Sequence, residues 1–458
     1  MRISASRLGS LLGDDRGDGP AYLWIADGIR AAVADGRVMH GMRLPGEREL
    51  APALAVSRTT ITKAYSVLTE RGYAQAKQGS GTTVVLPGGR PDEGDAEPLD
   101  DRPADPRLLN LVQAAPPATP GLQAAFETAL EQLPRFTTGR GYYSLGIPEL
   151  REAIAQRFVD RGVATSADQI VVTAGASSAV GIVLTALTAP RAAVVLESPG
   201  YPNTVQAVRG TGRRPVGVPV GDLAAHDEAL ARAKTCLVVL DFQNPTGGLA
   251  DDQHRAQLAR IWTRRGTTPI VDETLVETWL DDEPQVRPMA AHHPGAITIG
   301  SASKTHWGGM RLGWIRAPRH LVGALSAARR SFDLGSPVLE QLALDELLRT
   351  RPGLHPEMRR MLRGSRDRLW EFGIGCGWEA TRPHGGLSIW WRLPRPRGAA
   401  LATAAEREGL LMLPGAAFAV DGRGLDSFLR TPFTLRPEDI DRVLPALRAA
   451  AERAGLSG

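Results

Sequence analysis

The stretch "SASKTHWGGMR", residues 301–311, carries one of only four lysines in a chain of 458 residues. Arginine supplies nearly all of the other positive charge. Arginine stays protonated in proteins, whereas a desolvated lysine can lose its proton and attack a carbonyl. Lys304 is therefore a candidate to form a Schiff base, and Arg311, seven residues further on, could pair with a phosphate.

Small and polar residues follow other apolar runs of the sequence. In "TAGASSAVGIVL", Ala176 and Ser177 would present backbone N–H groups and a hydroxyl at a helix N-terminus, which is a site suited to phosphate. A tight strand-to-helix connection with no ligand is the alternative interpretation. Tyr201, in "ESPGYPNT", could stack on a flat ligand or fill the core.

Two further segments place polar side chains at the ends of apolar runs. "DFQNPTGG" holds Asn244 in a rigid loop, and "IVDET" places Asp272 at a strand end. A buried carboxylate needs a partner, and a heteroaromatic N–H⁺ would satisfy it. A phosphate site, a stacking ring, a carboxylate for a ring nitrogen and a reactive amine are together what pyridoxal phosphate requires. Lys234, by contrast, is expected on a solvated helix face.

The elements that must position these residues alternate along the chain. "QIVVTAG", "AAVVLES", "CLVVLDF", "TPIVDE" and "AITIGSAS" are apolar runs with polar or small ends, typical of strands in a buried parallel sheet. Amphipathic stretches such as residues 252–264 lie between them. The pattern predicts an α/β domain with its chemistry at the carboxyl ends of the strands.

A Pro-, Gly- and acid-rich stretch, residues 88–107, divides the chain. It cannot bury enough apolar surface to fold alone, so we expect a linker. The length also exceeds what one hydrophobic core usually organises. We therefore predict three parts: a small unit at 1–87, the linker at 88–107, and a large α/β domain at 108–458.

The first part has the order of a winged helix-turn-helix. A helix over residues 22–34 is followed by a turn and short helix in "LPGERELAPAL", a second helix in "VSRTTITKAYSVLTERGY" with Ser57 as its N-cap, and a glycine-rich hairpin at residues 78–81.

In such a unit the second helix enters the major groove of double-stranded DNA. Arg58 and Thr59 would then reach base edges, while Lys63 and Arg48 would contact phosphates. The alternative is a solvated amphipathic bundle with scattered arginines, but the order of helices, turn and wing favours DNA binding.

Composition excludes other classes of protein. The chain is 43% hydrophobic and 23% charged, and it has no apolar run near the roughly 20 residues that span a bilayer. A cytoplasmic location is expected, with no membrane partner. Cys236 and Cys376 stand alone in separate segments, which argues against a disulfide framework or a metal site. A net charge of +4 is too small by itself to indicate nucleic-acid binding.

The N-terminal motifs L-P-x-x-R-x-L-A and V-S-R-x-T resemble the DNA-binding domain of the GntR superfamily of bacterial regulators, over about residues 20–86. The resemblance implies DNA contacts at Arg48, Arg58, Thr59 and the wing glycine Gly79. Gly46 stands where the family often has a serine, and glycine is an acceptable N-cap.

From about residue 108 the motifs "YYSLGIPELREAI", "TAGASS", "ESPGYPNT", "QNPTG", "VDE", "SASKTHWGGMRLGW" and "FLRTPF" occur in the order found in fold-type I, class I aminotransferases. The resemblance implies a pyridoxal phosphate domain in which Lys304 forms the Schiff base. The other implied roles are a pyridine-nitrogen partner (Asp272), a hydrogen bond to the phenolic oxygen (Asn244), ring stacking (Tyr201), phosphate binding (Ala176, Ser177, Ser301 and Arg311) and recognition of a substrate α-carboxylate (Arg430).

Two departures from that pattern bear on catalysis. Aminotransferases usually place a tyrosine shortly after the pyridine-binding aspartate, but Asp272 is followed by Glu273, Thr274 and Leu275. "HWGG" also lacks the proline common between the lysine and the arginine. Both changes would alter turnover without removing cofactor binding.

The whole chain resembles the MocR subfamily of GntR regulators. The resemblance implies a transcription regulator that senses pyridoxal phosphate or a small amine or amino-acid effector. It also implies a head-to-tail homodimer with exchanged DNA-binding units. The alternatives are an aminotransferase with an accessory DNA-binding domain, and a cofactor-binding scaffold without a DNA partner. The joint presence of Arg48, Arg58 and Gly79 argues against the scaffold.

Overall fold

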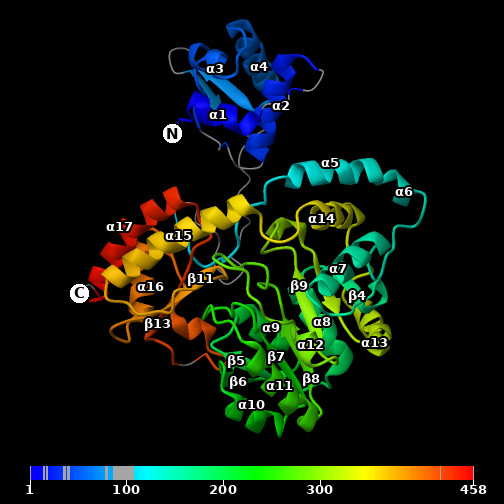
Figure 1. Cartoon of the computed structure of the whole chain (residues 1–458). Coiled ribbons are helices and arrows are strands. Elements are labelled where there is room, and N and C mark those ends of the chain that lie inside the picture. Colours follow the sequence, from blue (N-terminus) through cyan, green and yellow to red (C-terminus); the bar gives the residue numbers. More distant parts are fainter. Residues whose placement is uncertain are drawn as a thin grey trace. The chain divides into compact units, whose positions relative to one another are not determined.

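The computed structural model describes residues 2–13, 16, 19–34, 38, 42–77, 81–85, 108–422 and 424–456. The predicted linker, 88–107, and the wing residue Gly79 lie outside them. The chain forms two compact units, residues 1–95 with 118–124, and residues 96–117 with 125–458 (Figure 1).

The small unit is a winged helix-turn-helix, as predicted. Its elements are α1 (Ala5–Leu12), α2 (Ala21–Ala34), α3 (Glu47–Ala53), α4 (Arg58–Glu70), β1 (Ala74–Lys77) and β2 (Gly81–Val84). The strands pair antiparallel. Ser57 caps α4 by accepting a hydrogen bond from the Thr60 N–H at 3.1 Å. Helix α1 was not predicted from the sequence.

The four helices of this unit share one apolar core. Ile25 and Ile29 of α2, Leu50 of α3, and Ile61 and Leu68 of α4 are all buried. Their spacing of three, four or seven residues places each set on one helix face. The core fixes α3 against α4 and leaves the N-terminal end of α4 outward.

The large unit is built on a seven-stranded sheet with the order β4-β10-β9-β8-β7-β5-β6. The strands are β4 (Ile170–Thr173), β5 (Ala193–Ser198), β6 (Arg214–Pro219), β7 (Thr235–Val238), β8 (Thr268–Asp272), β9 (Ile297–Ser301) and β10 (Gly313–Arg316). Six run parallel, and β10 is antiparallel to both of its neighbours. The five strands predicted from the sequence, β4, β5, β7, β8 and β9, all run parallel, while β6, which is also parallel, and β10 were not predicted.

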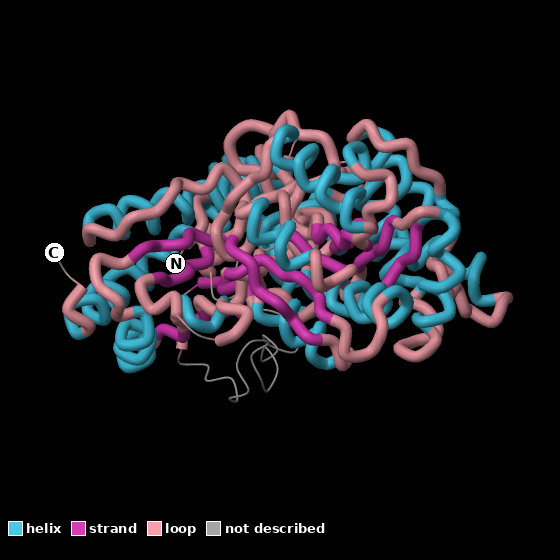
Figure 2. The backbone as a smooth tube through the Cα atoms, turned by 90° about the horizontal axis from the view of Figure 1, so that it is seen from below, coloured by secondary structure: helices cyan, strands magenta, loops and turns pink. Residues whose placement is uncertain are grey.

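Helices cover both faces of this sheet, as Figure 2 shows. Val194 and Leu196 of β5 pack with α8 (Ala176–Leu187), α9 (Pro202–Gly210) and α13 (Arg319–Arg329), whereas Ala193 and Val195 face the opposite way and pack with α10 (Leu223–Leu230) and α11 (Asp252–Arg265). This alternation, with both faces apolar, explains the continuous apolar runs in the sequence.

The helices that follow residue 108 complete the two layers and a C-terminal region. They are α5 (Leu122–Gln132), α6 (Pro134–Thr137), α7 (Pro148–Asp160), η1 (Ala167–Gln169), α8 (Ala176–Leu187), α9 (Pro202–Gly210), α10 (Leu223–Leu230), α11 (Asp252–Arg265), α12 (Met289–His292), η2 (Gly308–Met310), α13 (Arg319–Arg329), α14 (Val338–Thr350), α15 (Pro356–Gly375), α16 (Gly398–Arg407), η3 (Gly415–Phe418) and α17 (Pro437–Arg453).

The C-terminal region has a core of its own. Helices α15, α16 and α17 pack against β11 (Ser388–Arg392) and β13 (Phe428–Pro432), which form an antiparallel pair. A short parallel pair joins β12 (Leu410–Leu411) to β3 (Leu109–Asn110). Within the residues described, no helix is long and apolar enough to span a membrane, and both cysteines are buried and free.

Candidate functional site

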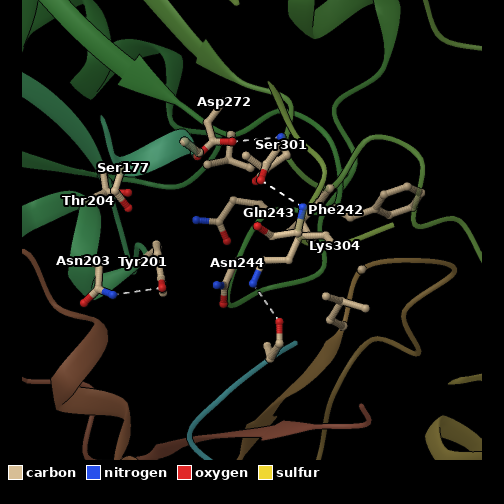
Figure 3. A pocket seen from close by; sticks show the side chains of 18 of the residues that line it. Ser177, Tyr201, Asn203, Thr204, Phe242, Gln243, Asn244, Asp272, Ser301 and Lys304 are labelled. Carbon is tan, nitrogen blue, oxygen red and sulfur yellow. Dashed lines mark hydrogen bonds between the residues drawn. The ribbon is translucent and has the colours of Figure 1, made fainter. Parts of the chain in front are cut away.

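The residues singled out by their chemistry gather around one cavity at the carboxyl ends of the parallel strands (Figure 3). Five of the strands deliver parts of the site at or shortly beyond their last residues: Ala176 and Ser177 follow β4, Tyr201 follows β5, Asn244 follows β7, Asp272 ends β8, and Ser301 and Lys304 lie at and beyond the end of β9. The lining residues among those predicted are Ala176, Ser177, Tyr201, Asn244, Asp272, Ser301, Lys304 and Arg311.

One end of the cavity has the features of an anion site. Gly175 caps α8 with a φ of +89°, and a Cβ there would lie 2.8 Å from Nη2 of Arg311. A Cβ on Gly313 would lie 2.7 to 2.9 Å from the backbone of Gly175, Gly300 and Ala176. Both glycines therefore let Arg311 and the N-terminus of α8 approach closely, and these donors suit a phosphate.

Asp272 ends β8 and is 8% exposed. Its Oδ1 accepts a hydrogen bond from the Thr274 N–H at 2.9 Å. Burial raises the pKa of this carboxyl, while the N–H and hydroxyl of Thr274 and the positive charge of Lys304 oppose the rise. A cationic ring N–H placed here would supply the charge partner that burial demands.

Lys304 follows β9, and its Nζ donates to the backbone oxygen of Ala114 at 2.9 Å (Figure 3). Burial, with the charges of Arg430 and Arg311, lowers the pKa of this amine to about 8, although Asp272 acts in the other direction. An appreciable fraction of the amine is thus neutral, and nucleophilic, near neutral pH.

The structure joins Asn244 to Arg430, which lies on β13. Nη1 of Arg430 donates to Oδ1 of Asn244 at 3.3 Å, and Nη2 donates to the backbone oxygen of Val112. Nε is buried without a hydrogen-bond partner in the described part of the chain. Burial lowers the pKa of Arg430 to about 10. This side chain is 1% exposed and does not line the cavity itself; it approaches the site through Asn244.

Tyr201 lies on the cavity wall at the start of α9. Its hydroxyl accepts a hydrogen bond from Nδ2 of Asn203 at 3.0 Å (Figure 3). Leu275 is buried and lines the cavity; it belongs to the segment shortly after Asp272 in which aminotransferases usually have a tyrosine. Leu275 has no hydroxyl group, so it cannot donate a hydrogen bond into the cavity as a tyrosine would.

Sequence reasoning missed several residues at this site. Gln243 organises the loop that carries Asn244, since its Nε2 donates to the Pro199 oxygen at 2.8 Å and its Oε1 accepts from Thr246. The backbone oxygens of Val112 and Ala114 were also missed, because a backbone acceptor leaves no mark in residue type.

The small unit presents the residues predicted to contact DNA. Arg58 and Thr59 lie in the first turn of α4 and are exposed, as is Arg48 in α3. Lys63 is exposed too, with its Nζ 3.9 Å from the centroid of the Tyr22 ring. All four side chains are thus exposed, two of them at the N-terminal end of α4.

Family models match both units. The model described as "Aminotransferase class I and II" matches residues 115–447, nearly three quarters of the chain. The chain belongs to this family. The model "Bacterial regulatory proteins, gntR family" matches residues 21–84. Together the two domains make the MocR architecture, as the sequence motifs predicted.

Relatives with the same architecture align along most of the chain. The chain is 28% identical over 444 residues to the uncharacterized HTH-type transcriptional regulator YdcR of Escherichia coli, covering 89% of this chain and 94% of YdcR. It is 27% identical to the HTH-type transcriptional regulator TauR of Rhodobacter capsulatus, covering 92% and 95%. The structure of LysN, an alpha-aminoadipate aminotransferase from Thermus thermophilus complexed with N-(5'-phosphopyridoxyl)-L-leucine, matches with a TM-score of 0.66 at 26% identity, covering 77% and 93%.

Proposed function

We propose that this protein is a transcription regulator that binds operator DNA through its small unit and senses an amine or amino acid through pyridoxal phosphate in its large unit. The observation that carries the proposal is the combination, in one chain, of an exposed recognition helix and a buried lysine amine beside an anion site. A metabolic aminotransferase has no need of an exposed recognition helix. This proposal includes a cytoplasmic location, where bacterial operators are found.

The residues of the cavity fit the cofactor. The close approach permitted at Gly175 and Gly313 leaves the α8 N-terminus and Arg311 free to hold the phosphate, together with Ala176, Ser177 and Ser301. Asp272 would hold the ring nitrogen, Tyr201 would stack on the ring and Asn244 would bind its phenolic oxygen. When bound, pyridoxal phosphate supplies a carbonyl carbon at which one amine can replace another.

The protein's own groups then prepare the exchange. Burial lowers the pKa of the Lys304 amine to about 8, so that part of it is neutral near pH 7.5, and Asp272 balances the positive charge of the site. Arg430, oriented by Asn244, would bind a ligand carboxylate with two parallel N–H groups. The effector favoured by this arrangement carries a primary amine and a carboxylate.

We also propose a head-to-tail homodimer with exchanged DNA-binding units. Two recognition helices would match the two half-sites of a palindromic operator, with Arg58 and Thr59 at base edges and Lys63, Arg48 and Gly79 at the backbone. The ligand must prefer one state of the dimer, since equal binding to both states shifts nothing.

A specific observation supports a second candidate, an aminotransferase with an accessory DNA-binding domain. Lys304, Asp272, Asn244 and Arg430 are all retained and are brought to one site. Leu275 weighs against it, because the donor to the phenolic oxygen is replaced by an apolar side chain.

One experiment separates the two candidates. Purified protein loaded with pyridoxal phosphate is titrated with amino acids and amines while its absorbance and its affinity for its own upstream DNA are recorded. A persistent spectral shift with one amine, accompanied by a change in DNA affinity, is the expected result. Conversion to the pyridoxamine form with release of a keto acid, and DNA affinity unchanged, would favour the enzyme.

A further inference from the structure

The segment 108–114, which we call the strap, lies over the candidate site. In sequence it comes directly after residues 88–107, through which the chain continues to the small unit. Its first half is anchored to the C-terminal region by β3: the Leu109 N–H donates to the Gly409 oxygen and the Leu111 N–H to the Leu411 oxygen, both at 2.8 Å.

A side-chain turn shapes the second half of the strap. Oδ1 of Asn110 accepts hydrogen bonds from the N–H groups of Val112, at 2.7 Å, and of Gln113, at 3.2 Å. Leu111 and Val112 are buried. This turn uses the N–H groups of Val112 and Gln113 within the strap. The backbone oxygens of Val112, Gln113 and Ala114 accept hydrogen bonds from donors outside it.

Those oxygens are bound by the two cations on which ligand recognition depends. The oxygen of Val112 accepts from Nη2 of Arg430, and the oxygen of Ala114 accepts from Nζ of Lys304 at 2.9 Å. In Figure 3 the dashed line from Lys304 ends on this segment. Between them, the oxygen of Gln113 accepts from the Thr434 hydroxyl at 3.3 Å.

We infer that the strap is the element that reports the ligand to the DNA-binding unit: a ligand carboxylate on Arg430 replaces the Val112 oxygen and loosens the strap. Nη1 and Nη2 of Arg430 are held by Asn244 and by the Val112 oxygen, so a carboxylate that binds these two nitrogens in parallel displaces the Val112 oxygen. The inference rests on the proposed function and adds the part of the chain through which it acts.

The contact between Arg430 and Val112 makes the response selective. A ligand without a carboxylate leaves the bond between Arg430 and Val112 in place, and the strap stays held at both ends. The strap therefore distinguishes amino acids from simple amines of similar size, and its loosened state is passed along the chain from residue 108.

Hydrogen exchange of the full-length protein tests the inference. Two probes are compared at saturation: phosphopyridoxyl-L-alanine, and phosphopyridoxyl-ethylamine, which lacks only the carboxylate. Neither probe forms a covalent bond with Lys304, so the carboxylate is the one difference between them. We expect the amides of residues 109–113 to exchange at least fivefold faster with the alanine conjugate. Equal exchange rates with both conjugates would overturn the inference.

A pair of variants tests the coupling to DNA without any ligand. Asn110→Ala removes the acceptor that shapes the strap and should shift ligand-free DNA affinity to the value of the wild type bound to the alanine conjugate. Asn110→Asp keeps the acceptor oxygen and should behave as wild type. Fast exchange in Asn110→Ala with unchanged DNA affinity would refute the role of the strap.

Measuring DNA affinity with both conjugates keeps the two proposals apart. If the alanine conjugate changes the DNA affinity of the wild type while hydrogen exchange in the strap stays constant, the inference about the strap is wrong and the proposed function stands. DNA affinity that responds to neither conjugate, with both bound by absorbance, contradicts the proposed function.

Discussion

The buried environment of Lys304 predicts an unusual pH dependence for its reaction with pyridoxal phosphate. The reaction requires the neutral amine, and burial lowers the pKa of this amine from 10.5 to about 8. The rate at which the lysine captures the cofactor should therefore rise with pH and level off shortly above pH 8.

The size of the effect follows from the fraction of neutral amine. Between pH 7 and pH 10 that fraction rises about tenfold for a pKa near 8, with nearly all of the rise complete by pH 9. For an unperturbed lysine it rises several-hundred-fold and is still climbing at pH 10. At pH 7.5 the buried amine is neutral in roughly a quarter of the molecules, against about one in a thousand for the unperturbed one.

Reductive trapping measures this rate directly. Protein is mixed with a small excess of pyridoxal phosphate at each pH, quenched with borohydride at set times, and the modified peptide that contains Lys304 is quantified by mass spectrometry. Lys304→Ala should show no modification in this peptide, whereas Lys234→Ala, at an exposed lysine, should keep the wild-type profile. A rate that still rises tenfold per pH unit at pH 9 would refute the argument from burial.

Three further substitutions follow from the structure. Gly313→Ala places a Cβ within 2.9 Å of backbone atoms at the anion site, so it should weaken cofactor binding by more than tenfold in an absorbance titration. The control Gly323→Ala, where a Cβ meets nothing within 4 Å, should leave cofactor binding unchanged. Asp241→Ala removes the carboxylate that lies 2.7 Å from Nη2 of the fully buried Arg255, and should lower the free energy of unfolding by about 3–5 kcal/mol, measured by thermal unfolding. The control Arg264→Ala, in an exposed ion pair, should shift the melting temperature little. Arg58→Ala should lower operator affinity about tenfold and relax specificity at the base that it contacts, and an undiminished affinity would rule out the proposed contact.

The sequence predicts much of this site because the chemistry follows strand ends. Asp272 and Lys304 come directly after apolar runs, and parallel strands bring their carboxyl ends to one edge. Periodicity places α4 in the small unit for a similar reason, since Ile61 and Leu68 fall on one helix face and Ser57 marks its start.

Other features depend on contacts between distant parts of the chain. Nothing local indicates that Arg430 binds Asn244, 186 residues away, or that β10 inserts antiparallel between β4 and β9. The strap is still less visible, because Val112 and Ala114 act through backbone oxygens that every residue has. Residues 109–112 are apolar apart from Asn110, and in the sequence they look like any other buried segment. Only the positions of their hydrogen-bond partners show the difference.

The strength of the strap contacts sets how complete a ligand response can be. A hydrogen bond to a charged group contributes about 1.5–3 kcal/mol, so loss of the Arg430 contact alone changes the equilibrium between two states by about 10- to 150-fold. Moving that equilibrium from 1:99 to 99:1 requires about 5.5 kcal/mol. Loss of the Arg430 contact alone therefore gives only part of a full switch. An amino acid that replaces Lys304 on the cofactor would leave this lysine as a free amine, as the alanine conjugate also does, so we expect the two ligands to change DNA affinity to the same extent. DNA-binding titrations with both ligands measure this, and a larger response to the free amino acid would mean that the state of Lys304 adds to the switch.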